Sequence, residues 1–101
     1  MLTTQALTTL KKCIVDNLDY AQYKVNSAYT KTPITSVEVT SAGNVEVRIQ
    51  INPTSTGTVT ISEVQLYDHS GRLWDSKVEN IQIKASQEGV LYLFTYTVTA
   101  S

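Results

Sequence analysis

The stretch Thr58–Trp74, TVTISEVQLYDHSGRLW, decides how the rest of the chain is interpreted. Apolar and polar side chains alternate along most of the segment up to Tyr67, and a second apolar segment begins at Leu73 after the polar residues Asp68–Gly71. Such alternation is typical of half-buried strands, and Gly71 can supply the positive φ that a tight turn requires. The stretch therefore predicts a β-hairpin.

The first strand of this hairpin changes phase along its length. Val59 and Ile61 share one face of an ideal strand, whereas Val64 and Leu66 share the opposite face. Either the strand is buried on both sides, or a bulge near Ser62–Glu63 restores the alternation.

Residues 1–18 have the pattern of an amphipathic helix, with Thr3 or Thr4 as its N-cap. Because such a short helix is marginal in water, we expect it to pack on a sheet. Cys13 lies at the edge of the apolar stripe, where inert, buried packing is the expected role. The stripe consists of Leu7, Leu10, Ile14 and Leu18.

Residues 19–33 fit neither the helical nor the strand period cleanly. A connecting hairpin with its turn at Asn26–Ser27 is the favoured interpretation, and a loop or a ragged extension of the helix is the alternative. Because no period accounts for Tyr20, Tyr23 and Tyr29, we expect these tyrosines to contact another subunit.

Residues 34–99 read as an antiparallel β region. The clearest alternation is Val45–Ile51, and a separate short strand is expected at Ile81–Ile83. Leu91 and Leu93 suggest that the last strand is covered on both sides in its first half. The aromatic residues expected in the core are Trp74, Tyr92, Phe94 and Tyr96.

The expected fold is one α+β domain over residues 1–101. It has an N-terminal amphipathic helix followed by six or seven antiparallel strands, which form a β-sandwich or a strongly twisted sheet.

Composition excludes several classes of protein. The chain has 101 residues and a net charge of −1, so it lacks the basic surface expected of a nucleic-acid binder. No apolar run approaches the ~18 residues of a membrane span, and no secretory signal is expected before the helix. The single cysteine excludes a disulfide within the chain.

Catalytic and metal-binding patterns are sparse. His69 is the only histidine, and a lone histidine in a polar turn between Asp68 and Ser70 is usually solvated rather than catalytic. One cysteine, one histidine and scattered carboxylates do not make a metal site. We therefore expect no enzymatic activity, no cofactor and no metal.

The motif Val59–Asp68, followed by Gly71 and Leu73, resembles the N-terminal, tail-attaching region of bacteriophage tail-fibre and collar-like proteins. In that region a similar strand follows an amphipathic helix and an earlier strand, for which Thr4–Leu18 and Ile34–Val39 are the counterparts here. The closing segment Glu88–Phe94 is similar to the end of such prophage-encoded proteins.

The resemblance implies a non-enzymatic structural or assembly protein of a phage or prophage tail. It would associate with its own copies or with other tail proteins, in the virion tail and, before assembly, in the bacterial cytoplasm. Tail fibres continue into a long repetitive shaft, whereas this sequence closes at Ser101. We therefore expect an accessory, joining or baseplate-type subunit.

A second interpretation remains open from the residues themselves. β-Sandwiches can bind glycans or peptides through exposed aromatic side chains, and the three tyrosines of residues 19–33 could form such a surface. The alternative function is therefore a carbohydrate- or peptide-binding module.

Overall fold

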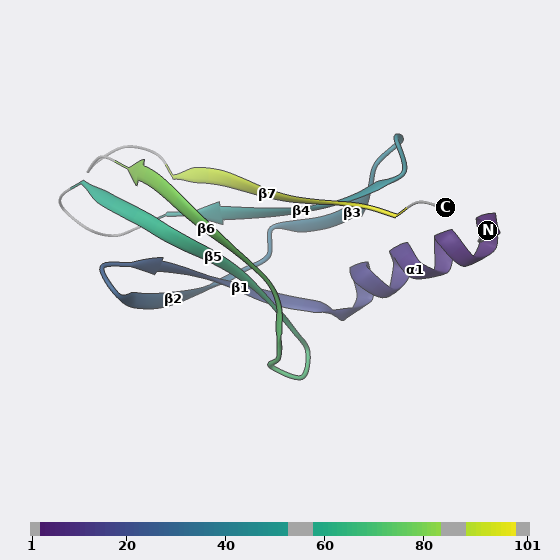
Figure 1. Ribbon diagram of the computed structural model, residues 1–101, viewed down its shortest axis with the longest axis horizontal. Coiled ribbons are helices and arrows are strands. Elements are labelled where there is room, and N and C mark those ends of the chain that lie inside the picture. Colours follow the sequence, from purple (N-terminus) through teal and green to yellow (C-terminus); the bar gives the residue numbers. More distant parts are fainter. Residues whose placement is uncertain (1–2, 53–57, 84–88, 99–101) are drawn as a thin grey trace.

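The computed structural model describes residues 3–52, 58–83 and 89–98. Within them, one helix precedes seven strands that pair only in antiparallel fashion, which confirms the predicted fold class. The sequence also predicts a loop at Asn52–Gly57 and a turn at Gln87–Gly89, and most of each lies outside the described residues. The elements are α1 (Thr4–Asn17), β1 (Leu18–Val25), β2 (Ala28–Pro33), β3 (Ser36–Val39), β4 (Asn44–Ile51), β5 (Val59–Asp68), β6 (Leu73–Ile83) and β7 (Val90–Thr97) (Figure 1).

The strands form two sheets that enclose the core between them. Sheet A has the strand order β2-β1-β5-β6, and sheet B has the order β3-β4-β7. Every second side chain of β4 points inward, and Val45, Val47, Ile49 and Ile51 are all fully buried, as their alternation predicts. Sheet A contributes Leu18, Ala21, Tyr23, Val59, Ile61, Val64, Leu66 and Ile83 to the core, and β7 contributes Tyr92 and Phe94.

Residues 19–33 form the favoured hairpin. The strands β1 and β2 pair from Tyr20 opposite Pro33 to Val25 opposite Ala28. The turn between them consists of Asn26 and Ser27, which have φ angles of 51° and 71°. Two successive positive φ values are the geometry of a type I′ turn, which matches the twist of antiparallel strands.

A bulge explains the phase change in β5. Lys24 of β1 lies opposite Glu63, but the next residue, Val25, lies opposite Ile61. Ser62 is therefore the extra residue, and it returns the following side chains to the inner face. As a result Val59, Ile61, Val64 and Leu66 are all buried.

Three predictions for the second half of the chain are wrong. Residues 73–83 form one continuous strand, β6, rather than two. Trp74, expected in the core, is 38% exposed at the sandwich edge. Leu91 and Leu93 are 51% and 44% exposed, because no described element covers the outer face of sheet B. Tyr92 and Phe94 are core residues as expected, and Tyr96 packs against the core while partly buried.

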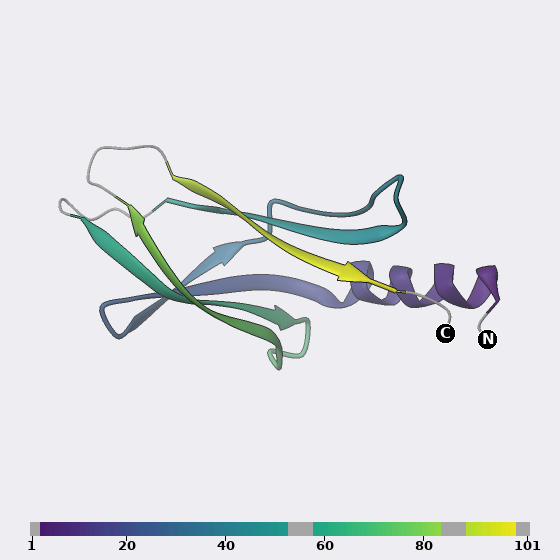
Figure 2. The same ribbon diagram turned by 45° about the horizontal axis from the view of Figure 1, so that its top comes forward.

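The helix packs loosely beside β3 and β4 of sheet B, rather than over sheet A. None of its residues is buried, and Cys13, expected inside, is exposed. Thr3 is the N-cap, since its hydroxyl accepts a hydrogen bond from the Ala6 N–H at 3.1 Å. At the other end Leu18 is already extended and begins β1. No loop allows α1 to turn back over sheet A, so it projects past that sheet towards the β3–β4 turn (Figures 1 and 2).

Candidate interaction surfaces

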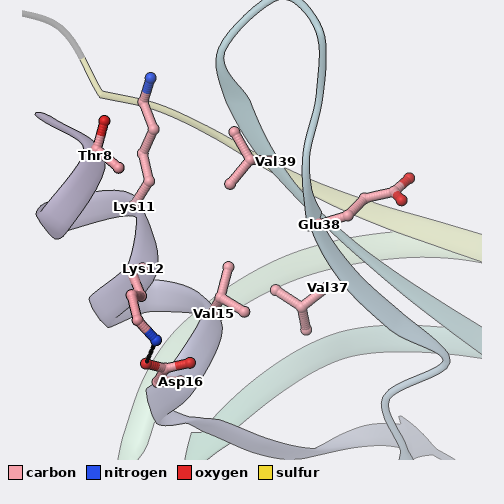
Figure 3. A pocket seen from close by; sticks show the side chains of 8 residues that line it. All are labelled: Thr8, Lys11, Lys12, Val15, Asp16, Val37, Glu38 and Val39. Atoms are coloured by element: carbon pink, nitrogen blue, oxygen red, sulfur yellow. Dashed lines mark hydrogen bonds and ion pairs between the residues drawn. The ribbon is translucent and has the colours of Figure 1, made fainter. Parts of the chain in front are cut away.

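A groove of about 440 Å³ separates α1 from β3. Figure 3 shows that Val37 and Val39 point across it towards the helix, where Val15 faces them. Lys12 and Asp16 form an ion pair of 2.8 Å at its rim. The groove therefore has an apolar floor and charged margins. Its lining is completed by Thr8, Lys11 and Glu38.

The apolar stripe of the helix is not the side that lines this groove. Leu7 and Ile14 are partly buried, and Leu10 is 44% exposed. Ile14 alone among them packs against the core. The helix thus leaves apolar surface uncovered by the described part of the chain, both in the groove and along its stripe.

The outer face of sheet A carries three tyrosines, Tyr20, Tyr29 and Tyr67, which we call the tyrosine face. The rings of Tyr20 and Tyr67 are stacked, with centroids 5.0 Å apart and an angle of 5° between their planes. Lys31 Nζ lies 4.0 Å from the Tyr20 centroid. Lys31 and Tyr67 approach the Tyr20 ring from β2 and β5, the two strands that flank β1.

A carboxylate at the centre of the tyrosine face is held by three donors. Glu63 accepts hydrogen bonds from the Tyr29 hydroxyl at 2.8 Å, the Gln65 amide at 2.9 Å and the Ser76 hydroxyl. Gln65 also accepts from the Tyr67 hydroxyl at 2.8 Å. The bond from Ser76, and then that from Tyr29, lower the pKa of Glu63. These three donors fill most of the roughly four acceptor positions of the carboxylate, so Glu63 fixes the neighbouring side chains.

The structure separates the three tyrosines that were predicted to form an interface. Tyr23 is only 6% exposed and belongs to the core of the single chain. Tyr20 is partly exposed, and Tyr29 is 46% exposed. Contact of Tyr20 and Tyr29 with another subunit remains a prediction. The sequence analysis did not single out Tyr67. After the bulge, its side chain alternates in step with those of Glu63 and Gln65, and it therefore lies on the outer face of sheet A beside Tyr20.

The turn between β5 and β6 is organised by Asp68. One carboxylate oxygen, Oδ1, accepts from the backbone N–H groups of Ser70 and Arg72, both at 2.9 Å. The N–H of Arg72, more than that of Ser70, lowers the pKa of Asp68. His69 is exposed, and its nearest carboxylate is that of Asp19 at 3.7 Å. Asp68, His69 and Ser70 therefore do not form a proton relay.

The inner face of β6 is charged and meets an aromatic stripe on β7. The Tyr92 hydroxyl donates to Glu79, and the Tyr96 hydroxyl donates to Asp75 at 2.6 Å. Between these pairs Lys77 Nζ lies 4.8 Å from the Phe94 centroid. Burial, and then the bond to the carboxylate, raises the pKa of each tyrosine well above its ordinary value. Asp75, Lys77 and Glu79 are spaced two residues apart, so sequence alternation alone could have placed their charges on one face of β6.

Residues 3–52, 58–83 and 89–98 contain no group of three or more histidine, cysteine, aspartate or glutamate side chains that could hold a metal ion. Over the same residues, no helix has the length and apolar character needed to cross a membrane.

Comparisons with protein-family models, with curated proteins and with solved structures give no match to this chain.

Proposed function

We propose that this protein is a non-enzymatic assembly subunit of a phage or prophage tail, of the accessory, joining or baseplate type. The observation that carries the proposal is the incompletely covered helix: Ile14 packs against the core, but none of the fourteen residues of α1 is buried. A helix of this length is marginal in water by itself, so a neighbouring subunit that covers its apolar surface would stabilise it. The resemblance of Val59–Asp68 to tail-attaching regions supplies the biological setting.

The surfaces of the chain suit association better than chemistry. The groove beside α1 offers an apolar floor at Val15, Val37 and Val39 with charges at its margin. The carboxylates of Glu63 and Asp68 are already bonded to donors within the chain. The protein would act by docking on its own copies or on neighbouring tail proteins.

A carbohydrate-binding role has weaker support. Sugars stack on open aromatic faces, but the Tyr20 ring is already stacked on Tyr67 and has Lys31 Nζ 4.0 Å from its centroid. Tyr29 has Lys24 Nζ at 5.6 Å from its centroid and donates its hydroxyl to Glu63. A glycan array in which Tyr29→Ala abolishes a reproducible signal would favour this alternative instead.

The decisive experiment asks whether the chain is part of assembled particles. Particles of the phage or prophage that encodes it would be purified by density-gradient centrifugation and probed by mass spectrometry. We expect the chain in tails of the wild type. A chain that is absent from purified particles, and that is strictly monomeric over a wide concentration range in light scattering, would refute the proposal.

A matched pair of variants tests the helix itself. Leu10→Lys should weaken incorporation into particles, because it places a charge on the uncovered stripe. Thr9→Lys is the control, since Thr9 is also exposed on α1 but lies outside the stripe. Equal incorporation of both variants would show that the stripe is not the contact surface.

A further inference from the structure

Among the described strands, the two sheets have four at their edges: β2, β6, β3 and β7. An exposed edge can pair with another chain, and proteins usually protect it with charges, proline or shortness. β3 has only four residues, and β2 carries Lys31 and Pro33. β6 carries the inward-facing charges Asp75, Lys77 and Glu79. Three of the four edges are therefore protected.

β7 has none of these protections. Its eight residues, VLYLFTYT, include no charge, no proline and no glycine, and they are rich in aromatic and aliphatic side chains. It pairs with β4 along its whole length, from Val90 opposite Ile51 to Thr97 opposite Asn44, and with no other described strand. Leu91 and Leu93 are also exposed on its outer face. An uncharged edge of this length and composition is suited to pairing.

We propose that β7 pairs antiparallel with β7 of a second copy, so that two three-stranded sheets B become one continuous sheet across a two-fold axis. This deepens the proposed function and rests on it for the biological role, because it names one surface through which copies associate. Self-pairing brings no like charges together, since β7 has no charge.

The pairing also covers the exposed leucines. In an antiparallel pair, residues that lie directly opposite each other point to the same face of the sheet. The two-fold axis therefore passes where one residue lies opposite the same residue of the second copy, not between two neighbouring positions. With the axis at Leu93, this residue lies opposite Leu93 of the second copy, and Leu91 lies opposite Thr95 of the second copy. The inner face then places Tyr92 opposite Phe94, two aromatic residues that already line the core.

Charges introduced at Leu93, on the proposed axis, provide the test. Leu93→Lys and Leu93→Glu should each weaken self-association by at least about tenfold, because like charges would lie opposite each other. An equimolar mixture of the two variants should restore a mixed dimer, which a general loss of stability would not allow. Val78→Lys is the control, because Val78 is 87% exposed on the protected edge β6 and should leave the dimer intact.

Sedimentation velocity would measure association, and circular dichroism would confirm that each variant folds. Should either Leu93 variant unfold, Thr95→Lys tests the same edge at an exposed polar position. Amide hydrogen exchange of the wild type at two concentrations should show added protection confined to β7.

The outcomes separate this inference from the proposed function. A wild type that stays monomeric at millimolar concentration, or a dimer insensitive to the Leu93 variants, would overturn the β7 pairing even if the chain is found in tails. A dimer that behaves as expected, with no chain in purified particles, would leave the pairing intact and refute the tail function.

Discussion

Replacing Phe94 by alanine would test how the two sheets pack. The ring is fully buried, with the Tyr92 ring 5.3 Å away at an angle of 70° and Lys77 Nζ above it. Truncation of a buried phenylalanine costs about 3–5 kcal/mol, and the loss of an edge-to-face contact favours the upper half of that range. We expect a loss of about 4 kcal/mol, a large share of the roughly 5–15 kcal/mol that stabilises a typical domain.

The control is the neighbouring residue on the same strand. Leu93 is 44% exposed on the outer face, so Leu93→Ala should cost less than about 1 kcal/mol in dilute, monomeric samples. Urea unfolding followed by circular dichroism would measure both variants, and the Phe94 variant should unfold about 2–3 M urea earlier than the wild type. Equal losses for the two variants would refute the assignment of inner and outer faces on β7.

Three further predictions follow from buried or strained positions. The pKa of Tyr96 is raised in the folded state, so the stability that this residue contributes is complete below its ordinary pKa of 10.0 and declines at higher pH. Tyr96→Phe removes the hydrogen bond to Asp75, and the free energy of unfolding of this variant should fall less steeply with pH above 10.0 than that of the wild type. The pKa of Asp68 is lowered, so the stability that it contributes is complete above the ordinary carboxyl pKa and declines as the pH falls. In Asp68→Asn the free energy of unfolding should therefore fall less steeply with decreasing pH than in the wild type. An unchanged pH dependence in the acid range would contradict this prediction. Gly89→Ala should prevent folding, as judged by soluble yield, because the added Cβ would lie 2.2 Å from a carbonyl oxygen of β4. At Gly71 an added Cβ meets open space, so Gly71→Ala should lower the free energy of unfolding by only about 1–2 kcal/mol, the cost of a positive φ for alanine.

The local parts of the fold could be predicted because their signals lie within a few residues. Alternation placed Val45 to Ile51 on the core face, and Asn26–Ser27 supplied residues able to adopt the positive φ of a hairpin turn. The bulge at Ser62 was one of two alternatives, and only pairing of β5 with β1 decided between them. Local sequence therefore determined which residues are strands and where most of them turn.

The surfaces were decided by tertiary structure. Leu91 and Leu93 look like core residues in sequence, yet β7 is an edge strand whose outer face no described element covers. Tyr23 looks like an interface residue, yet the hairpin turns it into the core, while the bulge brings Tyr67 beside Tyr20.

The helix has a clear apolar stripe, but β1 begins directly after it at Leu18, and the helix lies beside β3 and β4 with Leu10 of the stripe left exposed. In each case the sequence determined the two faces of an element, because side-chain periodicity is local. Which face is buried depends on pairing between distant segments, which the sequence pattern alone does not specify.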